Sequence, residues 1–302
     1  MPVLEFTIPP QWDQKTVNSV AHGAIHLSSG QLKNAKYHGC ILLDGMPVHT
    51  NERVTAGQLL RLEWPEKENT LPQPSGRILH IPFEDEHLMI IDKPAPLPTA
   101  CSARQSGETL ENAVYSHLNC PNPFVYRPVN RLDKGTSGLM IVAKSAYAQN
   151  LLQNQLHSDG FIREYLAVTE GIPSQATGMI DLPIGKAEGA TIKREVREDG
   201  QSAQTQYHVL QTENQRALIR LRLLTGRTHQ IRVHLASMGC PVAGDFLYGT
   251  ELAELPGRFA LHSTWLRVLH PITGQWLEYE SALPKSLSGL LNGGDGNHGL
   301  SP

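Results

Sequence analysis

One stretch, residues 127–144, constrains the fold of this chain more than any other, and it reads RPVNRLDKGTSGLMIVAK. A single acid, Asp133, stands between the cations Arg131 and Lys134 and is followed by a Gly-Thr-Ser-Gly turn. The apolar run at 139–143 then predicts a buried strand. Asp133 is therefore expected on the loop that leads into this strand. Such a loop can hold a catalytic group rigidly, and an Asp there can equally well only cap the turn or pair with Arg131.

A second stretch, residues 216–239, joins a predicted strand to a predicted helix. Apolar and cationic side chains alternate from 219 to 223, which predicts a strand with one apolar and one cationic face. The turn at 225–226 leads into helical spacing that ends at Gly239, and Thr228 is expected to cap this helix. Five arginines and no acid lie between residues 216 and 234. Such a local basic surface is what binding to a nucleic acid backbone requires.

Two histidines in this second stretch, His229 and His234, have a spacing that does not favour a metal site. They lie five residues apart, whereas a spacing of four places two imidazoles on one face of a helix. A third ligand does not follow at a useful interval. We therefore expect both rings to hydrogen-bond to the backbone or to phosphate, and we expect no bound metal.

The composition limits the class of protein further. The 302 residues are 40% apolar, enough for a proper core, and their net charge of −3 argues against coating a nucleic acid by bulk charge. The cysteines predict neither a zinc site nor a disulfide framework, because Cys40, Cys101, Cys120 and Cys240 are far apart. The N-terminus lacks the features of a secretion signal, and no run of residues approaches a membrane span. A cytoplasmic protein with reduced thiols is expected.

The chain divides into four predicted segments. Residues 1–66 predict two helices and a small sheet, with a helix cap at Ser28 and a hairpin turn at Asp44-Gly45. Residues 67–80 have the composition of a linker. Residues 81–285 carry both stretches described above and form the main domain, and residues 286–302 are rich enough in Gly, Asn and Ser to predict a disordered tail.

The stretch at 127–144 resembles the signature of the RluA-type pseudouridine synthases, enzymes that isomerise uridine in RNA. The family carries His-Arg-Leu-Asp before a Thr-Ser-Gly turn and an apolar strand, and this chain has Asn130 in place of the His. The run TGRTHQIR at 225–232 resembles the second hallmark of the family. Arg163 and Tyr165 match its basic-x-Tyr motif, with Arg replacing the usual Lys. Together the matches cover about residues 80–285.

The N-terminal segment resembles the S4-type RNA-binding module that precedes many of these catalytic domains. This copy has five Lys or Arg against six Asp or Glu over residues 1–66. Because neutralisation of phosphate supplies most nonspecific RNA affinity, two readings remain open. The module binds RNA, or it is a degenerate accessory.

The resemblance implies an α+β fold in which a mixed, mostly antiparallel sheet forms the catalytic domain beside the small α/β module. Strands at 139–143, 162–168, 204–210 and 217–224 are expected in a common sheet. The implied catalytic residues are Asp133, Tyr165 and Arg232. Arg232 is expected to bind the Asp133 carboxylate through two parallel hydrogen bonds, and Tyr165 to hold a base that is flipped out of its stack.

The resemblance also implies the partners. The expected RNA-binding residues are Arg131, Arg220, Arg222, Arg227 and His229. The expected substrate is ribosomal or else transfer RNA, the expected protein is a monomer, and no cofactor, metal or membrane is implied because the isomerisation is not a redox reaction.

Two other functions are compatible with parts of the sequence. A catalytically silent RNA-binding ribosome-assembly factor would keep the fold, and Asn130 is its best support. A glycoside hydrolase would need two carboxylates across a sugar, and no second acid stands out in the sequence.

Overall fold

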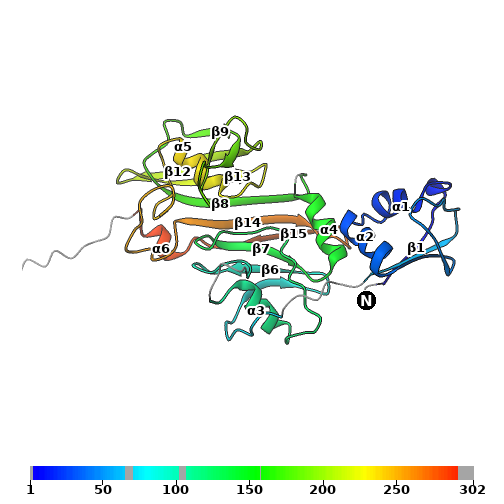
Figure 1. Ribbon diagram of the computed structural model, residues 1–302. Helices are drawn as coiled ribbons and strands as arrows, with labels where there is room; N and C mark the ends of the chain where they lie inside the picture. Colours follow the sequence, from blue (N-terminus) through cyan, green and yellow to red (C-terminus); the bar gives the residue numbers. More distant parts are fainter. Residues whose placement is uncertain (1–2, 65–70, 102–106, 157, 292–302) are drawn as a thin grey trace, which may run out of the picture.

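The computed structural model describes residues 3–64, 71–101, 107–156 and 158–291, and it contains one small and one large sheet (Figure 1). The small sheet is antiparallel, with the strand order β1-β4-β2-β3, and is packed on two helices. Figure 1 shows these N-terminal elements gathered at one end of the molecule. Their bounds are β1 Val3–Thr7, a 3-10 turn Pro10–Trp12, α1 Val17–Gly23, α2 Ser29–His38, β2 Cys40–Leu43, β3 Met46–Pro47 and β4 Leu59–Glu63.

Local sequence explains how this small unit is built. The Ser28 hydroxyl accepts from the Gln31 amide while the Gln31 side chain accepts from the Ser28 amide, so the predicted cap of α2 is confirmed. Asp44 and Gly45 both have positive φ, at 49° and 80°, as the predicted two-residue hairpin turn requires. Buried side chains of both helices and of the sheet, Leu60 and Leu62 among them, form a core of the unit's own.

The large sheet has nine strands, in the order β5-β6-β7-β14-β8-β13-β12-β9, with β15 paired to β14. Its strands are β5 His80–Glu84, β6 Leu88–Lys93, β7 Ser137–Ala143, β8 Phe161–Glu170, β9 Thr177–Asp181, β12 Gln204–Glu213, β13 Arg216–Leu223, β14 Leu261–Leu269 and β15 Trp276–Glu280. A separate hairpin is formed by β10 Ile184–Lys186 and β11 Arg194–Val196. The remaining described helices, beyond those of the N-terminal unit, are α3 Leu110–His117, α4 Ala146–Gln155, α5 Gln230–Ser237 and α6 Lys285–Ser288.

Among the pairs formed by the described strands, β7 with β14 is parallel and the others are antiparallel. The predicted α+β class is therefore confirmed. The four expected strands lie in β7, β8, β12 and β13 of this one sheet, as predicted.

The strands β6 and β7 are buried on both faces, which explains why each contains a continuous apolar run. In β7, Met140 and Val142 belong to the core that includes Leu110 and Val114 of α3. The alternate residues of β7 belong to a second core, which includes side chains of α4. One helix thus covers each face of the sheet at this point, and every residue of β7 is buried.

The C-terminal segment departs from prediction, because disorder from residue 286 onward is wrong for residues 286–291. Residues 286–288 belong to α6 and residues 289–291 form the turn that follows it, and Leu287, Leu290 and Leu291 lie in the main core. The Arg216 Nη1 atom also donates to the Leu290 carbonyl at 3.0 Å. The average composition of residues 286–302 is rich in Gly and Asn. This average conceals three leucines that pack into the core. The remainder of the predicted tail, 292–302, lies outside the described residues.

The segment predicted as a linker is only partly described, since residues 67–70 fall outside. Residues 71–79 contain no helix or strand. They are nevertheless attached to the large domain, because the Arg77 guanidinium donates to Glu108 at 2.6 and 2.9 Å. No helix in the described part of the chain has the length and apolar character needed to cross a membrane.

The division at residues 66 and 81 remains a prediction, and removing residues 1–66 tests it. Because the small unit has its own core, we expect the shortened protein to stay soluble and to unfold in one cooperative transition. Circular dichroism followed during heating is the measurement, with the full chain as control. An insoluble or non-cooperative product would show that residues 1–66 belong to the core of the large domain.

Candidate active site

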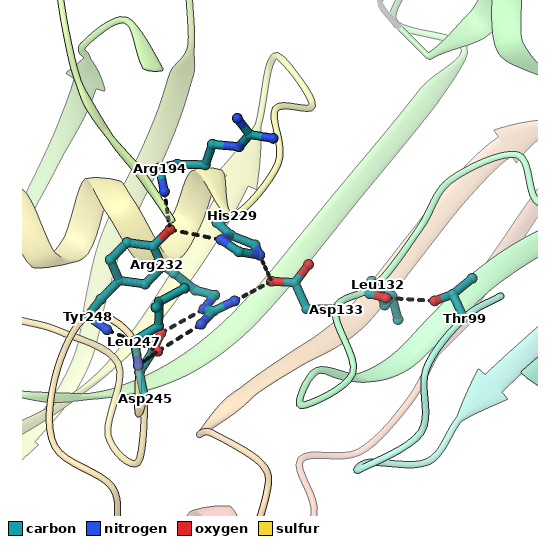
Figure 2. A network of polar contacts seen from close by, with 9 residues as sticks. All are labelled: Thr99, Leu132, Asp133, Arg194, His229, Arg232, Asp245, Leu247 and Tyr248. Atoms are coloured by element: carbon teal, nitrogen blue, oxygen red, sulfur yellow. Dashed lines mark hydrogen bonds and ion pairs between the residues drawn. The ribbon is translucent and has the colours of Figure 1, made fainter. Parts of the chain in front are cut away.

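Asp133 lies on the loop that enters β7, and neighbouring backbone fixes this loop at several points. The Thr99 hydroxyl donates to the Leu132 carbonyl at 2.6 Å, as Figure 2 shows, and the Leu97 amide donates to the Lys134 carbonyl at 2.9 Å. The Thr136 amide closes a turn by donating to the Asp133 carbonyl at 3.0 Å. The carboxylate is thereby held in place, with 30% of the side chain exposed.

The two glycines of the turn are needed for close packing. A Cβ atom on Gly135 would lie 2.6 Å from the Phe259 ring. Gly138 has φ of +105°, and a Cβ atom there would lie 2.2 Å from the Ser263 carbonyl oxygen on β14. The turn that identified the motif thus lets the Asp133 loop contact β14.

Arg232 on α5 contacts Asp133 across ninety-nine residues of sequence, as the motifs predicted. Its Nη1 atom donates to Asp133 Oδ2 at 2.8 Å (Figure 2). The expected pair of parallel bonds to Asp133 is wrong, however. The planar fork of Arg232 instead binds Asp245, from Nε at 2.7 Å and from Nη2 at 2.8 Å.

Asp245 is completely buried and fully engaged. Besides the two bonds from Arg232, its Oδ1 atom accepts from the backbone amides of Leu247 and Tyr248, at 3.0 and 3.3 Å. Arg232 itself is 3% exposed. Burial acts to lower the pKa of Arg232, but the hydrogen bond to Asp245 and the charges of both carboxylates raise it overall.

Two aromatic rings complete the setting of Arg232. The guanidinium carbon lies 4.2 Å from the centre of the Phe259 ring and 5.0 Å from that of Tyr248. Both distances suit cation–π attraction. The two rings and the two carboxylates together fix the orientation of the guanidinium. In this orientation a single N–H group points at Asp133.

His229 forms the other side of the carboxylate. Its Nε2 atom lies 3.8 Å from Asp133 Oδ2, and its Nδ1 atom shares a hydrogen bond of 2.8 Å with the Tyr248 hydroxyl. That hydroxyl already accepts from the Arg194 amide, so its own proton is free for Nδ1. Burial lowers the pKa of His229, more than the Asp133 charge raises it. When the Tyr248 hydroxyl donates to Nδ1 of the neutral ring, the ring proton is on Nε2, which faces Asp133.

Tyr165 lies on β8 and points to the same cavity. It is 4% exposed, and burial raises the pKa of its hydroxyl above the ordinary value. The residues that alternate with it toward this side are Phe161, Arg163 and Ala167, all buried. The strand expected at residues 162–168 is confirmed.

Asp133 and Tyr165 both line a cavity of about 700 Å³. Cationic and histidine side chains in its wall are Arg131, Lys134, Arg163, Arg227 and His229. Among the lining residues that the structure describes, Asp133 is the only acid. The cavity is therefore suited to a ligand that is anionic in part.

The remaining RNA-contact candidates lie outside this cavity. Arg220 is 53% exposed on β13, where its Nε atom is 3.8 Å from the Glu164 carboxylate. Arg222 lines a neighbouring hollow of about 230 Å³. The predicted cationic face of β13 therefore does not line the cavity that contains Asp133. It lies next to this cavity.

Three other predicted details have clear outcomes. His234 is buried and hydrogen-bonds to the Thr205 hydroxyl and the Leu182 carbonyl, each at 2.9 Å, so one of its expected roles is confirmed. Thr228 does not cap α5, because His229 occupies the cap position in a left-handed conformation without a side-chain bond. The loop is held instead by the Gln230 side chain, which accepts from the Arg227 amide at 2.9 Å.

The third detail is Asn130, the departure from the family signature. Its side-chain oxygen accepts from the Ile141 amide at 3.0 Å, and the residue is buried. Asn130 therefore supports β7 and its loop.

Sequence reasoning missed Asp245, Tyr248 and Lys93. The first two stand in a Gly-Asp and a Tyr-Gly pair, which signal only turns. Lys93, at the end of β6 and before a proline, is completely buried and donates to the carbonyls of Pro94 and Leu97 at 3.0 and 2.8 Å. Burial lowers its pKa to about 7, against the opposing effect of the Asp133 charge. A lysine at the end of an apolar run is the signal that was available.

Comparison with known proteins gives a consistent result. The sequence model of the family described as RNA pseudouridylate synthase matches residues 87–237. An uncharacterized RNA pseudouridine synthase of Bacillus subtilis (strain 168), YjbO, is 34% identical over 276 residues, covering 90% of this chain and 96% of the relative. Ribosomal large subunit pseudouridine synthase D of Nitrosomonas europaea is 38% identical over 266 residues, covering 83% of this chain and 76% of the relative.

A solved structure agrees with these relatives. The structure of human RNA Pseudouridylate Synthase Domain Containing 4 superposes with a TM-score of 0.56 and 25% identity, covering 70% of this chain and 91% of that one. The motifs in the sequence, the sheet and the match of most of the chain to these relatives lead to one conclusion. The chain belongs to the RNA pseudouridylate synthase family.

Proposed function

We propose that this protein converts uridine to pseudouridine in ribosomal RNA, with Asp133 as the catalytic carboxylate. The observation that carries the proposal is a partly exposed carboxylate, held by a buried Arg232, in the wall of a cavity lined by an aromatic side chain and several cations. Relatives named ribosomal large subunit pseudouridine synthase D favour ribosomal over transfer RNA. We further propose that it acts in the cytoplasm, as a monomer.

The reaction asks for few groups. The bond between C1′ of the sugar and N1 of uracil breaks, the base turns, and a bond between C1′ and C5 forms. The proton on C5 then leaves and N1 takes up a proton, so that the product is an isomer of the substrate. A carboxylate serves this sequence as a nucleophile or by stabilising positive charge on the sugar, and both roles need it ionised. A hydrogen bond from Arg232 fixes the Asp133 carboxylate in one orientation.

The carboxylate of Asp245 has a distinct part in this scheme. Arg232 is buried, and a lone buried cation would be costly. Its pairing with Asp245 offsets that cost and neutralises much of its charge. Asp133 therefore receives an oriented N–H group from a largely neutral pair.

The target base has to leave its stack to reach this cavity, which matches the way enzymes act on bases in RNA. Tyr165 is the aromatic side chain beside Asp133 in the cavity wall. We assign it the role of holding the uracil ring, since stacking on an aromatic face tolerates rotation of the base. Arg131, Arg227 and His229 are assigned to the RNA strand at the cavity mouth.

The assembly-factor alternative loses its support at Asn130. The side chain bonds to the backbone of β7, and the contacts of Asp133 with Arg232 are intact beside it. We propose that residues 1–66 act as an accessory RNA-binding module. Mapping pseudouridine in ribosomal and transfer RNA from cells with and without the gene tests the function and identifies the uridine. Maps that do not differ would contradict the proposal.

The first variant to test is Asp133→Asn, which keeps the shape of the side chain and removes its charge. We expect turnover to fall by on the order of 10⁴-fold or more while RNA binding persists. Release of tritium from C5-labelled uridine in RNA measures turnover, and a binding assay on the same RNA measures affinity. Asp159→Asn, an exposed acid outside the cavity, is the matched control. Near-normal release by Asp133→Asn would exclude this carboxylate from catalysis.

The second variant, Arg232→Lys, keeps the charge and loses the planar fork. A lysine cannot bond Asp245 at two points and also direct an N–H group at Asp133. Because such sites tolerate little displacement, we expect kcat to fall by about 100-fold, with a smaller change in RNA affinity. Arg267→Lys on β14 controls for the general effect of the exchange. If Arg232→Lys turned over as the control does, the fork would have no role.

The cationic face of β13 supports a prediction about salt. Arginines that reach solvent and meet phosphates release counterions, so affinity falls as salt rises. Replacing Arg220, Arg222 and Arg227 by Ala should reduce the slope of log affinity against log salt by about 0.7 for each phosphate that is no longer neutralised. Binding to the mapped RNA is measured from low to high salt, with Arg267→Ala as control. An unchanged slope would place the RNA path elsewhere.

A further inference from the structure

One buried cation in the cavity wall is used neither by the fold nor by the mechanism above. Arg163 on β8 is 6% exposed, and its Nε atom has no hydrogen-bond partner in the described part of the chain. No carboxylate of the described residues is paired with it, either. The guanidinium carbon of Arg163 lies 5.2 Å from the centre of the Phe161 ring.

This arrangement is incomplete in physical terms. A buried guanidinium needs a counterion or a full set of acceptors, and an aromatic ring offsets only part of the loss of water. Two other arginines line the cavity, but Arg131 is exposed, and Arg227 is half-buried and donates from Nε to the Ser202 carbonyl at 2.9 Å. Among these three arginines, the buried Arg163 is the one that requires an anion from outside the protein.

The guanidinium borders the cavity, because Arg163 is one of the residues that line it. Gly226 lies next to the guanidinium, and a Cβ atom built on Gly226 would be in van der Waals contact with the Nη2 atom of Arg163, at 3.6 Å. Both residues line the same cavity as Asp133. A guanidinium at a cavity wall presents donors in the planar fork that matches the oxygens of a phosphate.

The distance from Tyr165 indicates which anion would fit. Arg163 and Tyr165 are two residues apart on one face of β8, which corresponds to roughly 7 Å along the strand. In a nucleotide, the sugar separates the base from its flanking phosphates by a comparable length. A positive charge at Arg163 also acts on Tyr165, since it opposes the effect of burial on the pKa of that hydroxyl.

We propose that Arg163 binds one of the two phosphates that flank the target uridine while its base lies against Tyr165. The proposal rests on the proposed function and adds a nucleotide-phosphate subsite to it. Arg163 is a positioning residue in this scheme, because it fixes the sugar relative to Asp133 without touching the reacting atoms.

The test removes the phosphate charge and the arginine separately and together. Synthetic RNA that carries the mapped uridine is prepared with a neutral methylphosphonate at its 5′ or its 3′ flanking phosphate. For the wild-type protein, we expect one of the two replacements to lower kcat/KM about tenfold or more. Arg163→Gln should lower kcat/KM on unmodified RNA by a similar factor, and the same methylphosphonate should then cause no further loss.

Two controls separate this outcome from a general weakening. Arg267→Gln, on the adjacent strand β14, should keep the full wild-type response to each methylphosphonate. Arg163→Lys keeps a charge and should retain part of the response, and it also serves if Arg163→Gln does not fold, as judged by its thermal unfolding. The proposal would be overturned if, at both flanking phosphates, the methylphosphonate lowered kcat/KM of Arg163→Gln by the same factor as it lowers that of the wild-type protein. If only Arg163→Lys folds, the same comparison is made with that variant.

A wild-type protein indifferent to both methylphosphonates would overturn it as well. The failure of the proposed function is a different result, because the wild-type protein would then form no pseudouridine in the unmodified RNA.

Discussion

The contact that the candidate site depends on most is the bridge made by Arg232 between two carboxylates. One of them, Asp245, is completely buried and takes the guanidinium fork, and the other, Asp133, is partly exposed and takes one N–H group. The division is physically sensible. A buried cation needs a buried counterion, and a catalytic carboxylate needs an orienting partner that does not consume its charge. Asp245 satisfies the first need, so that Arg232 can satisfy the second for Asp133.

The fold brings these groups together by joining segments that are remote in sequence. Asp133 enters with β7, Arg232 with α5, and Asp245 with the loop that precedes β14. The parallel pairing of β7 and β14 is possible at this point because Gly138 lets the two backbones approach. The glycine-containing turn that marks the family in sequence therefore has a packing role, and the geometry of the site follows from that packing.

The sequence predicted those features that a local pattern or a motif specifies. It did not predict contacts that depend on how remote segments pack in the folded protein. Residue patterns and the family resemblance predicted four of the nine strands of the large sheet, and the resemblance of two motifs predicted that Asp133 and Arg232 meet. The second carboxylate escaped because Asp245 stands in a Gly-Asp turn, and nothing local distinguishes an acid that caps a turn from one that also neutralises a distant arginine. Leu287 escaped for a similar reason, since composition describes a segment and does not show whether a core lies within its reach.

The net charge of the protein and the local charge of the cavity have opposite signs. A chain with net charge of −3 binds a polyanion poorly by bulk attraction, so its affinity has to come from local groups. Those groups differ in kind. The arginines on the β13 face reach solvent, and in the proposed function they would contribute in a salt-dependent way to the binding of any RNA strand. Arg163 is buried, so in the proposed phosphate subsite its gain on meeting an anion would include relief of its own desolvation. That gain would be available only when a nucleotide has entered the cavity. The proposal thereby reserves the binding free energy at Arg163 for the flipped state, in which the sugar would also lie beside Asp133.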